Sequence, residues 1–389
     1  MSQSYLQLKV VGVTRETADA VTIHFEHPEK INIVSMAGQF LTLILPINGQ
    51  EVRRSYSLSS APYEAPRLAV TVKKVPNGIV SNYLVDKCAV GMEMKVLAPM
   101  GNFKVETHSA NARNIVLIGA GSGITPLISM AKAILHEEPK SHVTLIYGNR
   151  HEGTIIFKDK LNEMQAQYGN RLVVEHVFSQ PKADLNEAKS FGFKNISSWF
   201  KKKEEIPAES SDLQHKYKGR LNRKMLIQIL ENLQLTDYLD TEFYLCGPEG
   251  MMDEAKEALK ILKVSSDRIH KESFITAKEK EPAPHATVTT ANGGGDNADC
   301  HLVTLIFEGA EYKIPVQKNQ TILEAGLEKE IDLPYSCQAG LCTACRGKCL
   351  SGKVHLDESD GLSEAEIAAG YVLNCVGHPL TADVVIEIG

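Results

Sequence analysis

Short runs of apolar, β-branched residues alternate with polar positions over the first 107 residues. The runs LQLKVVGV, AVTIHFEH, QFLTLILPI, RSYSLSS and LAVTVKKV are separated by Gly, Pro, Asn and Asp. A period of two is typical of strands that bury one face, and many short strands at this spacing indicate a closed sheet. Residues 1–107 are therefore predicted to form an antiparallel β-barrel.

From Asn114 onwards, longer apolar runs take turns with amphipathic segments. Strands are predicted at NIVLIGA, HVTLIYGNR, RLVVEHVFS and EFYLCGP, and helices after NIVLIGA and near residues 156–168, 223–233 and 248–263. Regular alternation of strand and helix indicates a parallel sheet covered by helices. We predict a second domain of this α/β type over residues 112–275.

Two segments lack either periodicity. Residues 182–219 are long for a connection within such a sheet, are highly charged, and contain Trp199, the only tryptophan. We expect an insertion there, either a lid or partner-binding segment or a plain surface insertion. Residues 276–299 combine Pro, Gly, Thr, Asn and charge, which is typical of a flexible linker. The linker leaves a third domain at residues 300–389.

Composition narrows the class of protein. Of the 389 residues, 43% are hydrophobic and 23% are charged, as in globular proteins of two or three domains. Neither a signal peptide nor an 18-residue apolar run is visible, so a cytoplasmic protein without a membrane span is expected.

Residues 300–389 hold six Lys and Arg against 13 Asp and Glu, a net charge of −7. This acidic domain suits docking to a basic partner, or solubility alone, and no basic face suggests nucleic-acid binding.

Four of the eight cysteines fall in the stretch LPYSCQAGLCTACRGKC. The spacing Cys337-x4-Cys342-x2-Cys345, with Cys375 after 29 further residues, is the ligand pattern of plant-type [2Fe–2S] centres. Zinc sites more often use two separated C-x2-C pairs, and this chain has one such pair. An iron–sulfur centre is therefore predicted, with zinc as the alternative.

This stretch and the later LNCVGHPLTADVVIEI together resemble a plant-type ferredoxin domain, which has a β-grasp fold. The resemblance spans essentially all of residues 300–389. It implies that Cys337, Cys342, Cys345 and Cys375 hold the cluster. Cys349 is then not a ligand.

A cluster that takes single electrons needs a donor that splits hydride into single electrons, as flavins do. The run RRSYSLSS contains Arg54, Tyr56 and Ser57, which offer a diphosphate partner, a flat face and a hydroxyl. Further on, VKKVPNGIVSNYL places Gly78 and Ser81 where a helix start can bind phosphate. With AGQFLTL, these motifs resemble the flavin barrel of the ferredoxin–NADP⁺ reductase superfamily. The resemblance implies FAD rather than FMN, with Ser57 near the flavin N5.

The run IGAGSGITPLISM joins a predicted strand to a predicted helix. Ile124 stands where the usual dinucleotide fingerprint has its third glycine. The run instead resembles the superfamily's G-x-G-x-x-P nucleotide loop, here Gly121, Gly123 and Pro126. Backbone N–H groups at this helix start are expected to bind a diphosphate. Thr125 and Pro126 are expected to be the N-cap and the first helical residue.

Two later motifs complete the resemblance to the superfamily. Cys246-Gly247-Pro248 would lie beside the nicotinamide, with Cys246 positioning C4 for hydride transfer. Judged from its own segment alone, Cys246 is a small core residue at the end of a strand. Glu272 and Phe274, in HKESF, would close the site near the flavin.

The nucleotide preference is predicted from the end of the second α/β strand. NAD-binding sheets commonly place a carboxylate there for the ribose 2′-hydroxyl. This chain has Arg150 instead, with no carboxylate before Glu152. Because an arginine suits a 2′-phosphate, NADPH is expected, and NADH remains possible.

The domain order resembles that of the reductase components of bacterial multicomponent oxygenases, most of all those of the phenylacetyl-CoA epoxidase type in phenylacetate catabolism. It implies hydride transfer from NADPH to FAD, then single electrons to a [2Fe–2S] cluster and on to a terminal oxygenase component. One alternative is a general NAD(P)H:acceptor oxidoreductase with another partner. The other is a flavin reductase whose ferredoxin domain is only a docking module.

Overall fold

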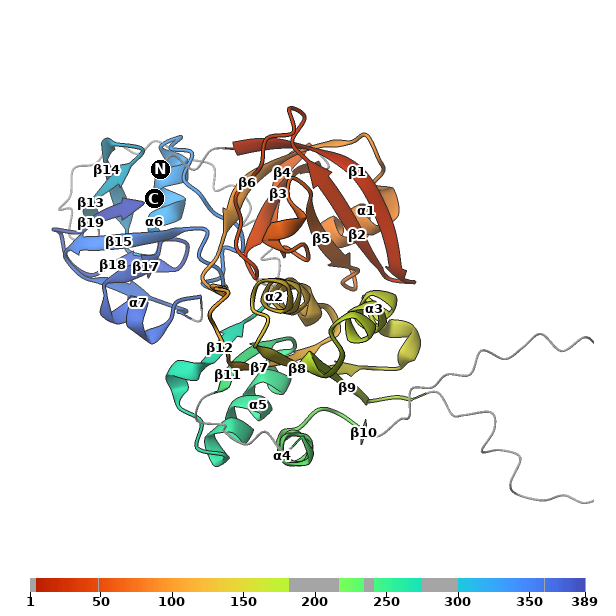
Figure 1. Cartoon of the computed structure of the whole chain (residues 1–389). Coiled ribbons are helices and arrows are strands. Elements are labelled where there is room, and N and C mark those ends of the chain that lie inside the picture. The colour runs from red at the N-terminus through yellow and green to blue at the C-terminus, as the bar shows by residue number, and fades with distance from the viewer. Residues whose placement is uncertain are drawn as a thin grey trace, which may run out of the picture.

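A computed structural model of the protein describes residues 5–47, 49–181, 217–233, 241–274, 300–359 and 361–388. These residues form three bodies, each with its own sheet (Figure 1). Most of the expected insertion 182–219, Trp199 and the linker 276–299 lie outside the described residues. The domain limits drawn from the sequence therefore stay predictions, although the three main sheets fall within residues 5–100, 114–272 and 300–388.

The first body is a β-barrel with one helix. Its elements are β1 (Tyr5–Thr17), β2 (Ala20–Glu26), β3 (Phe40–Ile47), β4 (Gln50–Ser57), β5 (Leu68–Lys73), α1 (Ile79–Lys87) and β6 (Glu93–Met100). The antiparallel sheet runs in the order β4-β3-β6-β1-β2-β5, and its two edges meet at a bridge between Leu58 and Val70. Leu84 and Val85 of α1 pack into the apolar interior, so the helix closes one end of the barrel. The predicted barrel is confirmed.

The second body is a parallel sheet with helices on both faces. Its elements are β7 (Asn114–Ala120), α2 (Ile124–Glu137), β8 (His142–Asn149), α3 (Lys158–Tyr168), β9 (Leu172–Phe178), β10 (Tyr217–Lys218), α4 (Arg223–Asn232), β11 (Thr241–Cys246), α5 (Glu249–Ile261) and β12 (Ile269–Glu272). The strand order β10-β9-β8-β7-β11-β12 reverses between β7 and β11. Ligands bind at such a switch point, beyond the carboxyl ends of the strands.

The two faces of this sheet have different neighbours. Helices α4 and α5 cover the face that points away from the barrel, and α2 and α3 lie between the sheet and the barrel (Figure 1). Phe103 and Val105, which follow the last barrel strand, share one apolar core with Leu127 and Ile128 of α2. The barrel and the α/β domain are therefore packed together by continuous apolar contact.

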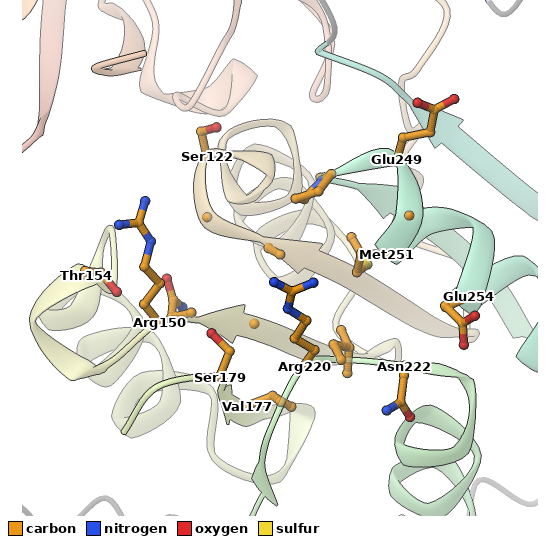
Figure 2. Close-up of a pocket in the computed structure, with 18 of the residues that line it drawn as sticks. Ser122, Arg150, Thr154, Val177, Ser179, Arg220, Asn222, Glu249, Met251 and Glu254 are labelled. Carbon is orange, nitrogen blue, oxygen red and sulfur yellow. The ribbon is translucent and has the colours of Figure 1, made fainter. Parts of the chain in front are cut away.

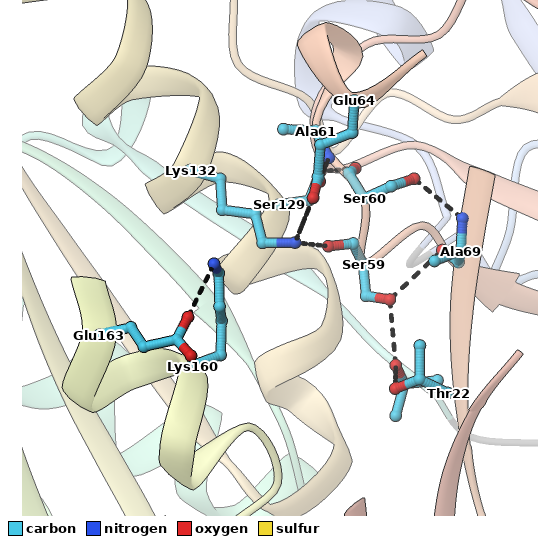
Figure 3. A network of polar contacts seen from close by, with 11 residues as sticks. Thr22, Ser59, Ser60, Ala61, Glu64, Ala69, Ser129, Lys132, Lys160 and Glu163 are labelled. Carbon is cyan, nitrogen blue, oxygen red and sulfur yellow. Dashed lines mark hydrogen bonds and ion pairs between the residues drawn. The ribbon is translucent and has the colours of Figure 1, made fainter. Parts of the chain in front are cut away.

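A polar network reinforces this junction (Figure 3). The Lys132 Nζ, on α2, donates to the Ser59 carbonyl at 3.0 Å and pairs with the Glu64 carboxylate at 3.0 Å. The Ser129 hydroxyl donates to the Ser60 carbonyl at 2.6 Å. Because Ser59 and Ser60 closely follow strand β4, the network holds that end of the strand against α2.

The third body is a mixed sheet crossed by one helix. Its elements are β13 (Cys300–Phe307), β14 (Ala310–Gln317), α6 (Ile322–Glu328), β15 (Arg346–Ser351), β16 (Val354–Leu356), α7 (Glu364–Ala368), β17 (Tyr371–Leu373), β18 (Gly377–Pro379) and β19 (Val385–Ile388). The main sheet has the order β14-β13-β19-β15-β17, and β16 pairs with β18. Thr321 and Glu324 cap α6 reciprocally, which fixes where the helix begins. The arrangement is the expected β-grasp fold.

Two linked local predictions, for Thr125 and Pro126, are wrong. Thr125 is not an N-cap, because a 3₁₀ turn, Gly121–Gly123, runs directly into α2 and makes Gly123 the capping residue. Thr125 lies inside the first turn, where its hydroxyl donates to the Ser122 carbonyl at 3.0 Å. Pro126, expected to be the first helical residue, is the third residue of α2. It is tolerated there because N–H groups of the first turn have no helical partner.

Candidate active site

Three side chains from distant parts of the sequence meet beside the switch point. Cys246, the last residue of β11, pairs in register with Glu272, the last residue of β12. Ser57, the last residue of β4, donates its hydroxyl to Glu272 Oε2 at 3.2 Å. Cys246 is fully buried and Ser57 nearly so. The three residues that the sequence singled out for hydride transfer therefore lie together.

Burial controls the charge of this group. It raises the pKa of Glu272 to about 8, and the hydrogen bond from Ser57 offsets only part of that rise. Burial, with the nearby Glu272 carboxylate, raises the pKa of Cys246 well above its usual value. At pH 7 the thiol is neutral and the carboxyl is mostly protonated. A buried, neutral Cys246 is thus unsuited to nucleophilic attack.

The glycine-rich loop and the Cys246-Gly247-Pro248 turn fit against each other with no room for a side chain. A Cβ added to Gly123 would lie 2.0 Å from the Cys246 carbonyl oxygen. Gly247 has a φ of +158°, and its added Cβ would lie 3.1 Å from the Ala120 nitrogen. The close approach explains the need for glycine at both positions. It also brings the two loops together, so that both line one cavity.

That cavity has a volume of about 910 Å³, within the range of pockets that take small molecules and cofactors. Its walls come from the carboxyl ends of β7, β8, β9 and β11. Among the residues that line it are Lys73, Gly121, Ser122, Asn149, Arg150, Ser179, Arg220, Gly247, Pro248 and Phe274. Phe274 follows the strand of Glu272 and is 40% exposed. An elongated nucleotide therefore has a path from the glycine loop to the far strands.

Two arginines mark the far end of the cavity. Arg150 follows β8, and Arg220 precedes α4, whose N-cap is Asn222. Figure 2 shows Arg150, Ser179 and Arg220 on the side away from Glu249. Two cations and a hydroxyl together suit a phosphate group.

Ser179 and Arg220 were not found from the sequence. Arg220 follows the charged segment 182–219, and the strand before it, β10, has only two residues. No hydrophobic periodicity therefore marked Arg220 as the end of a strand. The available signal was the run GRLNR, where an asparagine N-cap follows a glycine and an arginine.

The residues expected to hold FAD lie on the barrel. Arg54 and Tyr56 alternate along β4 with Arg53 and Ser55, because successive side chains point to opposite faces of a strand. Tyr56 packs against the barrel core, and burial raises its pKa despite the nearby Arg54 charge.

Gly78 is the N-cap of α1, as expected for a helix start, and an added Cβ there would lie 2.6 Å from the Ser81 hydroxyl. Ser81 Oγ accepts a hydrogen bond from the Val75 N–H at 3.1 Å, which tightens this turn.

The four predicted cluster ligands contact one another in pairs. The Cys337 thiol interacts with Cys342 and Cys375, and Cys375 interacts also with Cys345. Hydrogen bonds from Cys342 and Cys375 hold the pKa of Cys337 far below its usual range. The Cys349 thiol instead points to the carbonyl oxygen of Ser351 at 3.2 Å. Convergence of three thiols from one loop with a fourth from elsewhere fits a [2Fe–2S] cluster.

Across the residues that the structure describes, no group of three or more His, Cys, Asp or Glu is arranged to hold a metal ion. The fit of the four cysteines therefore rests on their pairwise contacts and on their spacing.

Within the same described ranges, none of the helices has the length and apolar character needed to cross a membrane.

Three family models match successive parts of the chain. They are the oxidoreductase FAD-binding domain at residues 7–105, the oxidoreductase NAD-binding domain at 117–196, and the 2Fe-2S iron-sulfur cluster binding domain at 305–380. The last match includes all four candidate ligands. These matches confirm the predicted cofactor classes and their order along the chain.

Similar proteins span the whole chain. One subunit of the 1,2-phenylacetyl-CoA epoxidase of Escherichia coli K12 is 33% identical over 390 residues, which cover 99% of this chain and 98% of that protein. The ferredoxin reductase component of 3-ketosteroid-9-alpha-monooxygenase from Rhodococcus rhodochrous is 32% identical, covering 98% and 96% of the two chains.

A solved structure shows the same fold. Phthalate dioxygenase reductase is 22% identical, with a TM-score of 0.55 over 99% of this chain and 98% of that one. The three-domain architecture predicted from the sequence is confirmed. The chain belongs to the family of oxygenase reductase components that join an FAD-binding, an NAD-binding and a 2Fe-2S domain.

Proposed function

We propose that this reductase takes electrons from NADPH and delivers them singly to an oxygenase component of the phenylacetyl-CoA epoxidase type. The meeting of Ser57, Cys246 and Glu272 is the observation that carries the proposal. When bound, FAD and the cluster supply the conversion of an electron pair into single electrons. The protein supplies binding, orientation and charge.

The flavin side of the site is assigned to the barrel. Arg54 pairs with the FAD diphosphate, Tyr56 offers its ring, and Gly78 with Ser81 forms the second phosphate contact at the start of α1. Ser57 lies where the barrel meets the α/β sheet, so its hydroxyl can hold a group at the flavin N5 edge. Glu272, mostly protonated at pH 7, stores a proton beside that hydroxyl.

The nucleotide side is assigned to the α/β domain. Gly121, Gly123, Thr125 and Pro126 shape the diphosphate loop at the first turn of α2. Gly247 and Pro248 line the cavity where the nicotinamide would lie, with Phe274 at its edge and the buried Cys246 directly before them in the chain. Cys337, Cys342, Cys345 and Cys375 hold the cluster in the third domain.

The preference for NADPH is supported by the far end of the cavity. Arg150, expected from the sequence, is accompanied there by Arg220 and Ser179. The acidic residues among the lining, Glu249 and Glu254, belong to α5. A 2′-phosphate is thus matched by two guanidinium groups.

The function is tested by a visible spectrum of the purified holoprotein. The spectrum is recorded anaerobically during titration with NADPH and, separately, with NADH. Bleaching of flavin bands and iron–sulfur shoulders by about three electrons per chain is expected, since a flavin accepts two and a cluster one. Flavin bands without cluster bands would favour the flavin reductase with a docking module. Full reduction without electron delivery to an epoxidase component would favour a general NAD(P)H:acceptor oxidoreductase. We also propose a cytoplasmic location, supported by the four cysteines outside the proposed cluster ligands, none of which forms a disulfide: Cys88, Cys246, Cys300 and Cys349.

A further inference from the structure

The ferredoxin domain contacts the barrel on both sides of its cysteine loop. Before the loop, Asp332 and Ser336 bond to barrel side chains. After the loop, Arg346 Nη1 donates to Asn102 Oδ1 at 3.2 Å and pairs with Glu366 at 2.6 Å. Asn102 also donates to Glu366. Ser336 and Arg346 are the direct neighbours of Cys337 and Cys345, so the barrel touches the residues next to two candidate ligands.

Arg53 is the centre of the first contact. Only 6% of its side chain is exposed, and its guanidinium lies 4.3 Å from the ring centre of Tyr335. Its Nη2 reaches Glu51 at 2.8 Å within the barrel and Asp332 at 3.3 Å across the interface. The Tyr5 hydroxyl donates to the same Asp332 carboxylate at 2.7 Å. A buried cation therefore bridges the two domains through both a ring and a carboxylate.

The charge of Arg53 is secured by its surroundings. Burial alone would lower its pKa, but Tyr335, Glu51 and Tyr5 outweigh that effect and raise the pKa overall. The guanidinium is thus a permanent cation at this junction.

Strand β4 links this contact to the proposed flavin site. Arg53 and Ser55 point to the ferredoxin domain, and Arg54 and Tyr56 alternate with them on the other face. The Ser55 hydroxyl donates to the Ser336 hydroxyl at 2.7 Å. Ser55 directly precedes Tyr56, and Ser336 directly precedes Cys337. This hydrogen bond therefore joins residues adjacent to the two proposed redox sites, and β4 supports both of them.

We infer that Arg53 is a positioning residue for electron transfer from flavin to cluster, because it fixes the cysteine loop against β4. This inference rests on the proposed function, in which electrons pass between these two groups. Arginine is required, since a planar guanidinium can stack on Tyr335 and pair with Asp332 at once, and an ammonium cannot do both. Asp332 is 58% exposed, so salt screens its part of the contact.

The test uses the full-length holoprotein with the substitutions Arg53→Gln, Arg53→Lys and Asp332→Asn. Rapid mixing with NADPH follows flavin bleaching and cluster bleaching separately. Cluster reduction is expected to slow about tenfold in Arg53→Gln while flavin reduction is unchanged, because the docked population falls. Asp332→Asn changes only an exposed side chain and should act in the same direction without affecting folding. Arg67→Gln, which breaks an exposed ion pair with Glu26 elsewhere on the barrel, is the matched control.

Hydrogen–deuterium exchange of residues 332–337 gives a readout that does not depend on turnover. Faster exchange is expected in both Arg53 variants and in Asp332→Asn, and in native protein at high salt. Native rates of cluster reduction and exchange in Arg53→Gln would overturn the inference. If NADPH fails to reduce even the native flavin, the proposed function fails, and the exchange experiment still decides whether Arg53 holds the loop.

Discussion

The Ser57 hydroxyl lies 3.2 Å from a carboxylate oxygen of Glu272, and this hydrogen bond joins the barrel to the last strand of the α/β sheet. The two residues are 215 positions apart in sequence. The polar network at Lys132 lies close to the end of β4 that carries Ser57, and Glu272 lies on β12, which pairs in parallel with β11.

Replacing Glu272 by Gln should change how stability depends on pH. The folded pKa of about 8 lies above the ordinary value, so native protein holds a proton that the unfolded chain releases. This contribution to stability is complete below pH 4.5, and it is lost as the pH rises to about 8. Denaturant unfolding between pH 5 and 9 should show a fall in native stability, on the order of a few kcal/mol, that the variant lacks.

Glu257→Gln is the control for that series, because Glu257 is exposed on α5 and far from Ser57 in sequence. If the Glu272 variant kept the full pH slope of the native protein, the raised pKa would be refuted. Flavin reduction in the variant should also lose any step in its pH profile near 8.

Gly123→Ala should be severely destabilising. The new methyl group would lie 2.0 Å from the Cys246 carbonyl oxygen, and backbone atoms on both sides must move. We expect a loss of about 2–3 kcal/mol in the free energy of unfolding, together with weaker NADPH binding. Gly250→Ala, where nothing lies within 4 Å of the added Cβ, should be neutral or slightly stabilising. Equal thermal midpoints for the two variants would contradict the close-packing argument.

Arg150→Glu and Arg220→Glu should each reduce the preference for NADPH over NADH. Loss of one charged hydrogen bond to a 2′-phosphate corresponds to a change of about tenfold to a hundredfold in KM for NADPH. NADH lacks that phosphate, so its KM is the internal control and should stay constant or improve. A preference for NADPH that survived both substitutions would move the phosphate contact elsewhere in the cavity.

Cys342→Ser should abolish the iron–sulfur absorbance, whereas Cys349→Ser should retain it. The reason is that Cys342 contacts the Cys337 thiol, and Cys349 is bonded to its own strand end. Iron and sulfide analysis of both purified variants measures the outcome. A full cluster in the first variant, or its loss in the second, would revise the ligand set.

Much of the fold was predictable because the periodicities are local. Strands such as AVTIHFE and VTLIYG carry their burial pattern in consecutive residues, and the cysteine spacing is contained mostly in one loop. The contact between Glu272 and Ser57 was suggested only by resemblance to a family, since no local pattern relates residues so far apart. Arg53 shows the limit most clearly. In sequence it is merely the neighbour of Arg54, and only the docked third domain gives it a role.

Thr125 failed as an N-cap for a related reason. The run GSGITP is compatible with a cap at Thr125, but tertiary packing of Gly123 against Cys246 draws the chain into a 3₁₀ turn first. Contacts made by β11, more than a hundred residues later, therefore decide where α2 begins.

The buried Lys132 and its partners have a consequence for protein engineering. Because this lysine bonds to Ser59 and Glu64 across the junction, separating the barrel from the α/β domain would leave a charge without a partner in an apolar surface. The ferredoxin domain meets the barrel through the buried Arg53, which keeps Glu51 as a partner within the barrel, and through a few other polar side chains. A chimaera is therefore best cut within residues 276–299, so that the flavin and nucleotide portions are exchanged together. An iron–sulfur portion that replaces the native one should keep a carboxylate at the position of Asp332 and a ring at that of Tyr335, because both contact Arg53.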